Sequence, residues 1–125
     1  MSSLPKEVIE DWNVRSGPIV LATIDENGIP NAVYASCVSR YSDEIIIVAD
    51  NYFNKTRANI LAGSKASLLF ITESKKSYQI KGSITLHDSG PVYEDMKKWN
   101  PPDLPGHAAA AITVEEVYSG AEKLI

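Results

Sequence analysis

Short apolar segments separated by turn residues dominate the hydrophobic pattern of the chain. The run from Ile45 to Ala49 is too continuous for a strand with one wet face, so it predicts a strand covered on both sides. From Tyr78 to Leu86 apolar and polar residues alternate, which is typical of a strand with one buried face. By these criteria the sequence predicts six strands, at residues 18–25, 30–39, 44–50, 66–72, 78–86 and 108–118.

Three short helices are predicted between and before these strands. Each has apolar residues three or four positions apart, which places them on one face. The first is expected to follow the cap Ser3, the second the cap Asn54, and the third the start signal Gly90-Pro91.

Two pairs of consecutive strands are joined by tight turns, which favours antiparallel pairing. Asn27-Gly28 is the dipeptide that a type I′ hairpin turn prefers, and a polar loop at residues 73–77 joins the second pair. The chain lacks the helix after every strand that a doubly wound parallel sheet requires. The pattern therefore predicts a mainly β fold, a six-stranded antiparallel barrel with short flanking helices.

Composition narrows the class of protein. The 125 residues carry 12 basic and 16 acidic side chains, a net charge of −4, and this acidic balance argues against a nucleic-acid partner. A hydrophobic fraction of 44% and the lack of a Pro-, Gly- or Ser-rich linker predict one domain over residues 1–125. Charges interrupt the N-terminal apolar positions, so we expect no membrane span, and with Cys37 as the single cysteine we expect a cytoplasmic protein.

The most informative stretch begins at Asp50, where a buried strand ends and a helix starts with Lys55, Thr56 and Arg57 in its first turn. A helix N-terminus has unpaired N–H groups and the positive end of the dipole, so cations there are repelled unless an anion is bound. We interpret this corner as a phosphate site, with Thr56 and the backbone N–H groups as hydrogen-bond donors and with Lys55 and Arg57 neutralising the phosphate. The alternative is a surface helix whose cations point to solvent or pair with Asp50.

A second candidate is the strand segment Val33-Tyr34-Ala35-Ser36-Cys37. Its small residues Ala35 and Ser36 let a flat ligand approach the backbone, whose N–H and C=O groups can bind the edge of a heterocycle. Cys37 has no histidine near it in sequence, so we interpret it as a buried, inert thiol and assign it no role.

Other chemistry has little support in the sequence. His87 and His107 lie 20 residues apart without metal-ligand spacing, so we predict no metal site and assign no role to either histidine. Most aromatic residues are expected in the core. Trp99 is the exception, because it ends an amphipathic helix just before Pro101-Pro102 and is expected at a rim, where it can border a ligand.

In their order along the chain, these features resemble the FMN-binding split barrel proteins related to pyridoxamine 5′-phosphate oxidase, in particular the small single-domain FMN-binding proteins. The resemblance covers nearly the whole chain, and its specific part is Lys55-Thr56 with Ala58-Asn59. It implies a split β-barrel, FMN as the cofactor, and a homodimer with two FMN sites at the subunit interface. The choice between FMN and a deazaflavin stays open.

The resemblance also implies residue roles. The pair matching Lys55-Thr56 helps to bind the FMN phosphate in that family, the segment matching Val33 to Ser36 lies along the flavin, and Asp50-Asn51 corresponds to the backbone beside the ring. Trp99 and the tail Leu124-Ile125 are implied to reach the partner's cofactor. The predicted cofactor-binding residues are thus Val33, Tyr34, Ala35, Ser36, Asp50, Asn51, Lys55, Thr56 and Trp99.

Two functions follow from this resemblance. Residues 119–125 do not match the basic, aromatic segment that holds pyridoxal phosphate in the oxidase, so vitamin oxidation is not implied. We expect an FMN-dependent oxidoreductase or flavin reductase with an unidentified redox partner. The alternative is a non-catalytic flavin-binding module for electron relay, storage or sensing. An oligonucleotide-binding barrel is a distant third interpretation, because the chain is acidic.

Overall fold

The computed structural model describes residues 2–125, and its secondary structure is mostly strand. Three helices, α1 (Lys6–Trp12), α2 (Lys55–Leu61) and α3 (Pro91–Trp99), accompany eight strands. The strands are β1 (Ile19–Ile24), β2 (Pro30–Ala35), β3 (Val38–Arg40), β4 (Ile45–Asp50), β5 (Lys65–Ile71), β6 (Ser77–His87), β7 (Ala108–Ser119) and β8 (Glu122–Lys123). Within the described chain, no helix is long and apolar enough to cross a membrane.

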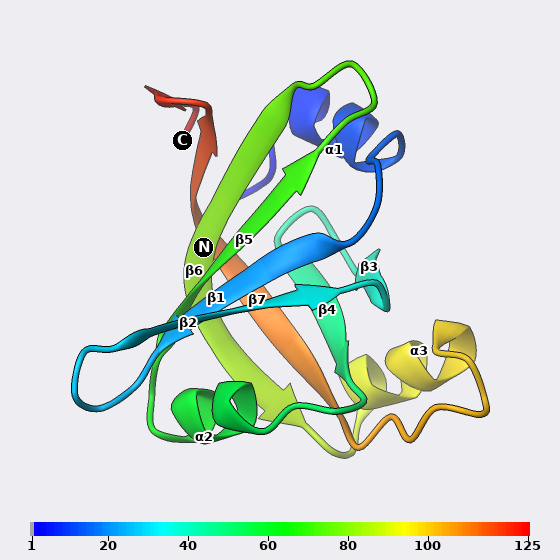
Figure 1. Ribbon diagram of the computed structural model, residues 1–125. Coiled ribbons are helices and arrows are strands. Elements are labelled where there is room, and N and C mark those ends of the chain that lie inside the picture. The colour runs from blue at the N-terminus through cyan, green and yellow to red at the C-terminus, as the bar shows by residue number, and fades with distance from the viewer. Residues whose placement is uncertain (1) are drawn as a thin grey trace.

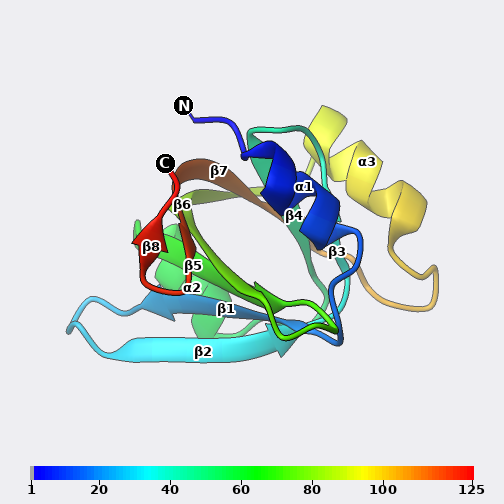
Figure 2. The same cartoon turned by 90° about the horizontal axis from the view of Figure 1, so that it is seen from above.

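All strands belong to one antiparallel sheet in the order β2-β1-β5-β6-β7-β4-β3, with β8 paired to the end of β7. The sheet curls around a single interior, and α1 lies across one open end of it (Figures 1 and 2). The predicted mainly β, split-barrel fold is therefore confirmed. The predicted number of six strands is wrong.

The difference in strand number comes from two places. The predicted strand at residues 30–39 is two strands, because the chain turns at Ser36-Cys37 and the Val38 N–H donates to the Ser36 carbonyl at 3.1 Å. As a result β2 pairs with β1 while β3 pairs with β4, at the opposite edge of the sheet. The short β8 was not predicted, and it returns the tail to the barrel, where the Leu124 N–H donates to the Val117 carbonyl at 2.7 Å.

Local signals at the turns and caps were partly misleading. The predicted type I′ turn is wrong, because Gly28 has a positive φ of 79° and Asn27 does not. Instead, the Gly28 N–H donates to the Asp25 carbonyl at 3.0 Å. The Asp25 carboxylate accepts the N–H groups of Asn27 and Ile29. Neither α1 nor α2 has a side-chain cap, so the predicted capping by Ser3 and Asn54 is also wrong.

A close backbone approach at Gly82 allows the sheet to curl. The register between β6 and β7 shifts between Lys81 and Gly82, which is a β-bulge. A Cβ atom at Gly82 would lie 1.8 Å from the Thr113 carbonyl oxygen, so only glycine fits at this position.

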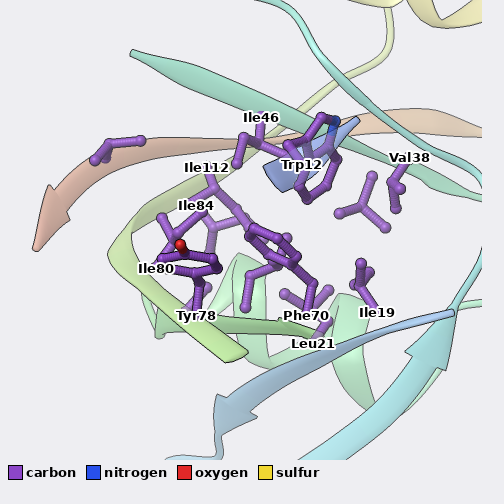
Figure 3. Close-up of a cluster of buried hydrophobic side chains, with 14 of the residues drawn as sticks. Trp12, Ile19, Leu21, Val38, Ile46, Phe70, Tyr78, Ile80, Ile84 and Ile112 are labelled. Carbon is purple, nitrogen blue, oxygen red and sulfur yellow. The ribbon is translucent and has the colours of Figure 1, made fainter. Parts of the chain in front are cut away.

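Aromatic residues from three elements meet in the core (Figure 3). Trp12 of α1 meets Phe70 of β5 edge to face, with ring centroids 5.1 Å apart, and Phe70 stacks on Tyr78 of β6 at 5.2 Å. The Tyr78 hydroxyl donates to Asp11 Oδ2 at 2.6 Å, so it links the barrel to α1. Burial, followed by the bond to Asp11, raises the pKa of Tyr78 above its ordinary value.

Replacing Tyr78 with phenylalanine is expected to lower the free energy of unfolding by about 1–2 kcal/mol at neutral pH, because a buried hydrogen bond to a carboxylate is lost. The folded state holds the Tyr78 proton more tightly than the unfolded state does. The wild-type advantage is therefore complete below about pH 10 and shrinks as the pH rises above it, where the unfolded tyrosine ionises. Urea unfolding of both proteins across this range measures the difference, and an advantage that does not change with pH would contradict the linkage.

Candidate functional site

A cavity of about 400 Å³ opens where the end of β2, the β4–α2 connection and the loop before β7 meet. These segments are distant in sequence, and the curl of the sheet brings them together (Figure 1). The lining residues are Val33, Tyr34, Ala35, Ser36, Cys37, Ala49, Asn51, Tyr52, Phe53, Asn54, Lys55, Thr56 and Leu104.

Seven of the nine residues predicted to bind a cofactor line this cavity. They come from both of the segments that the sequence singled out, and they are Val33, Tyr34, Ala35, Ser36, Asn51, Lys55 and Thr56. Asp50 and Trp99 do not line it. That these residues hold a cofactor remains a prediction, but the structure gathers most of them around one hollow.

The Asp50 side chain, at the end of β4, is held by contacts within the protein. Its side chain is fully buried, one carboxylate oxygen accepts the Phe53 N–H at 3.0 Å, and the other forms an ion pair with Arg57. The sequence left open which cation would pair with Asp50, and the structure selects Arg57. Arg57 is therefore committed to Asp50, whereas Lys55 is exposed beside the cavity and makes no ion pair within residues 2–125.

Thr56 is only 2% exposed, and its hydroxyl is held from behind by a polar network. Asn31 Nδ2 donates to Thr56 Oγ1 at 3.0 Å and lies 3.3 Å from Thr23 Oγ1. Asn59 Nδ2 donates to the same Thr23 oxygen at 3.0 Å. Because Asn31 is the donor in its bond with Thr56, the Thr56 proton is left to be donated elsewhere, and Thr56 borders the cavity.

The two ends of the cavity differ in polarity. Lys55 and Thr56 supply a cation and a hydroxyl where α2 begins, and Asn54 lies next to them. Away from this corner the lining is mostly small or apolar, with Ala35, Cys37, Ala49 and Leu104, and it also includes Ser36 and Asn51. The arrangement suits a ligand with an anionic end and a flat, apolar body.

Tyr34 and Tyr52 border the cavity with unusually exposed rings, 78% and 77% respectively. Large aromatic residues are seldom this exposed unless another surface covers them. Both rings therefore lie largely in solvent at the border of the cavity.

Trp99 does not line the cavity but packs behind residues that do. It packs against a second apolar cluster that contains Ile47, Ala49 and Met96, and its Nε1 donates to Asp95 Oδ2 at 3.1 Å. The expected contact between Trp99 and a ligand is not made within the cavity of its own chain, although Ala49 belongs to both the cluster and the cavity. A contact with the site of a partner subunit stays a prediction.

Sequence reasoning missed several residues of the site. Asn31 stands at an inward-facing position of β2, and a polar residue at such a position was the signal that could have identified it. Leu104 is in a loop without periodicity, so no pattern pointed to it. Cys37 lines the cavity, although the sequence had given it no role.

The histidines lie elsewhere. His87 shares a hydrogen bond of 3.0 Å with Thr85, and His107 is exposed in the loop before β7. Over the described range 2–125, no three His, Cys, Asp or Glu side chains gather closely enough to hold a metal ion.

Comparison with known proteins identifies the family. The family model described as pyridoxamine 5′-phosphate oxidase matches residues 5–120, nearly the entire chain. The chain belongs to the pyridoxamine 5′-phosphate oxidase family. The resemblance seen in the sequence is thereby confirmed.

A curated relative and a solved structure extend this match. The uncharacterized protein MJ0282 of Methanocaldococcus jannaschii is 30% identical over 106 residues, which cover 81% of this chain and 71% of that protein. The crystal structure of HupZ from Group A Streptococcus is similar with a TM-score of 0.80 and 25% identity, over 93% of each chain.

Two more distant structures share the fold and are described by different ligands. An FMN-binding protein from Syntrophomonas wolfei has a TM-score of 0.70 at 21% identity, covering 90% of this chain and 86% of its own. HutZ, described as a heme storage protein from Vibrio cholerae, has a TM-score of 0.70 at 17% identity, covering 94% and 95%. The fold therefore does not by itself specify the ligand.

Proposed function

We propose that this protein is an FMN-binding flavoprotein whose cavity holds the phosphate near Lys55 and Thr56 and the isoalloxazine ring toward Cys37, Ala49 and Leu104. The observation that carries the proposal is the polarity of the cavity, a cation and an available hydroxyl at one end and small or apolar groups at the other. The FMN-binding relative from Syntrophomonas wolfei supports the choice of ligand.

A homodimer is part of this proposal, because an apolar face adjoins the cavity. Val20 in β1 lies directly between Tyr34 in β2 and Leu69 in β5. Leu69 is 45% exposed and Ile71 further along β5 is 38% exposed, so the outer face of these strands is unusually apolar. A second copy packed on this face covers Tyr34 and closes the open side of the cavity.

The bound flavin would supply hydride or single-electron transfer at its ring. The chain contributes binding and orientation: Lys55 neutralises charge, Thr56 donates a hydrogen bond, and the apolar end excludes water. An oxidoreductase or flavin reductase with an unidentified partner is the function we favour. A non-catalytic flavin-binding module remains the alternative.

Absorption spectroscopy and mass spectrometry of the purified protein test the shared part of both functions. We expect a flavin spectrum, or uptake of added FMN with a shift of its visible bands, because the cavity transfers the ring from water to an apolar surface. NADH or NADPH oxidation then separates the reductase from the binding module. A heme Soret band and no uptake of FMN would contradict the proposal in favour of the ligand named for HutZ.

Replacing Lys55 with alanine is expected to weaken the binding of FMN about 10-fold to 100-fold. The binding of riboflavin should change very little, because only FMN carries the phosphate. Isothermal titration with both flavins measures the two changes. Lys6→Ala on α1 removes the same charge from an exposed position on another element and is the matched control. An equal loss of affinity for both flavins would mean that the phosphate does not bind beside Lys55.

Trp99→Ala tests the implied contact with a partner subunit. If Trp99 reaches the partner's cofactor, the variant changes the fluorescence of bound FMN or the dimerisation constant measured by analytical ultracentrifugation. Trp99→Phe keeps the packing on Met96 and serves as the control for the apolar cluster. An unchanged dimer and an unchanged flavin spectrum in Trp99→Ala would assign Trp99 to packing alone.

A further inference from the structure

The side-chain amides of Asn51 and Asn100 form a reciprocal pair beside the cavity. Asn51 Nδ2 donates to Asn100 Oδ1 at 3.0 Å, and Asn100 Nδ2 donates to Asn51 Oδ1 at 2.9 Å. The two residues are 8% and 6% exposed. Burying an amide is unfavourable unless its hydrogen bonds are made, and each of these amides supplies the partner that the other needs.

A third hydrogen bond fixes the direction of this amide pair. The Gly106 N–H donates to Asn51 Oδ1 at 2.9 Å, so this oxygen must face a backbone donor and the Asn51 amide cannot turn over. Gly106 has a φ of +51°, and a Cβ atom there would lie 3.0 Å from Asn100 Nδ2. The backbone at Gly106 therefore packs directly against the pair.

The pair attaches the loop at residues 101–107 to the wall of the cavity. Asn51 and Leu104 both line the cavity, Asn51 from the end of β4 and Leu104 from the loop. The loop is also held toward its C-terminal end, where Lys97 Nζ lies 3.3 Å from the Pro105 carbonyl and the His107 N–H donates to the Asp50 carbonyl at 2.9 Å. Asn51 is the side chain that joins the loop to the cavity itself.

We propose that the Asn51–Asn100 pair is a positioning device that holds Leu104 against the ring end of the bound flavin and so sets how long the cofactor stays bound. This inference rests on the proposed function. It differs from the role of Lys55, which acts on the phosphate end. Loss of the pair loosens the part of the loop that carries Leu104, while the Lys97 and His107 contacts remain. The apolar wall then moves away from the ring and the phosphate contacts stay in place.

Two variants test the wall directly. Asn100→Ala removes the pair, and Leu104→Ala removes the apolar group that the pair holds. Both are expected to speed FMN dissociation about tenfold, the factor that corresponds to one lost buried contact. Both variants should weaken the binding of FMN and of riboflavin by the same factor, whereas Lys55→Ala should weaken the binding of FMN alone. The visible circular dichroism of bound FMN should change as well, since it reports the surroundings of the ring.

Asn100→Asp adds a reversible form of the test. An ionised carboxylate at this position faces Asn51 Oδ1, which Gly106 holds in place, so two acceptors oppose each other. Burial raises the pKa of such a carboxyl group, and its neutral form donates an O–H to Asn51 Oδ1 and restores the pair. FMN dissociation from Asn100→Asp is therefore expected to be fast at about pH 8 and to approach the wild-type rate at about pH 5.

The control is Asn27→Asp, which makes the same chemical change in the exposed turn between β1 and β2. It and the wild type are measured at the same two pH values. Fast dissociation at the higher pH only in Asn100→Asp supports the inference.

Three outcomes would overturn the inference. One is FMN dissociation from folded Asn100→Asp at the wild-type rate at both pH values. Another is weaker binding of FMN to Asn100→Ala with unchanged binding of riboflavin. If the Asn100 variants do not fold, a wild-type dissociation rate in Leu104→Ala is decisive against it. Failure of the wild-type chain to bind any flavin defeats the proposed function as well, whereas normal wild-type binding with unaffected variants defeats this inference alone.

Discussion

The Asp50 carboxylate at the end of β4 is fully buried, and the shape of the cavity depends on how it is satisfied. One carboxylate oxygen accepts the Phe53 N–H, and the other forms an ion pair with Arg57. The backbone carbonyl of Asp50 accepts the His107 N–H. A buried carboxylate without such partners would be strongly destabilising. The carboxylate contacts hold the connection between β4 and α2 to the start of α2, and the backbone carbonyl of Asp50 ties the same point to the loop before β7. The same requirement takes up Arg57 and leaves Lys55 as the cation beside the cavity.

The β4–α2 connection separates two kinds of surface. On one side, Thr56 is backed by Asn31, Thr23 and Asn59, so that its hydroxyl is oriented by side chains from two strands and a helix. On the other side, the Asn51–Asn100 pair brings a loop toward small and apolar groups. Both arrangements pair buried side-chain amides with hydrogen-bond partners, and such networks favour one geometry. Membership of the pyridoxamine 5′-phosphate oxidase family fits this geometry, and the contrast between the two surfaces is what makes FMN the favoured ligand.

Much of the fold could be predicted from local pattern. Strand β4 was identified from its continuous apolar run, and α3 from Gly90-Pro91, because burial on both faces and helix initiation leave local signatures. The prediction failed where tertiary pairing overrides local pattern. Residues 30–39 have strand propensity throughout, yet the chain turns at Ser36-Cys37 to reach the opposite edge of the sheet. The turn at Gly28 failed for a different, local reason, because hydrogen bonds to the Asp25 side chain two and four residues away set its conformation.

For the site, the sequence by itself determined which residue types were present at the two decisive segments, the small residues around Ala35 and the pair Lys55-Thr56. The family, too, was predicted from the sequence, and the family model that matches residues 5–120 spans both segments. Only the tertiary structure decided which cation Asp50 takes, which amide backs Thr56, and that Leu104 faces the same hollow as Asn51. The physical reason is that burial and hydrogen-bond satisfaction depend on how the whole chain packs, as with Asn31 and Thr56, which lie 25 residues apart. Such pairings are selected by the packing of the whole chain and leave no periodic signal in the sequence.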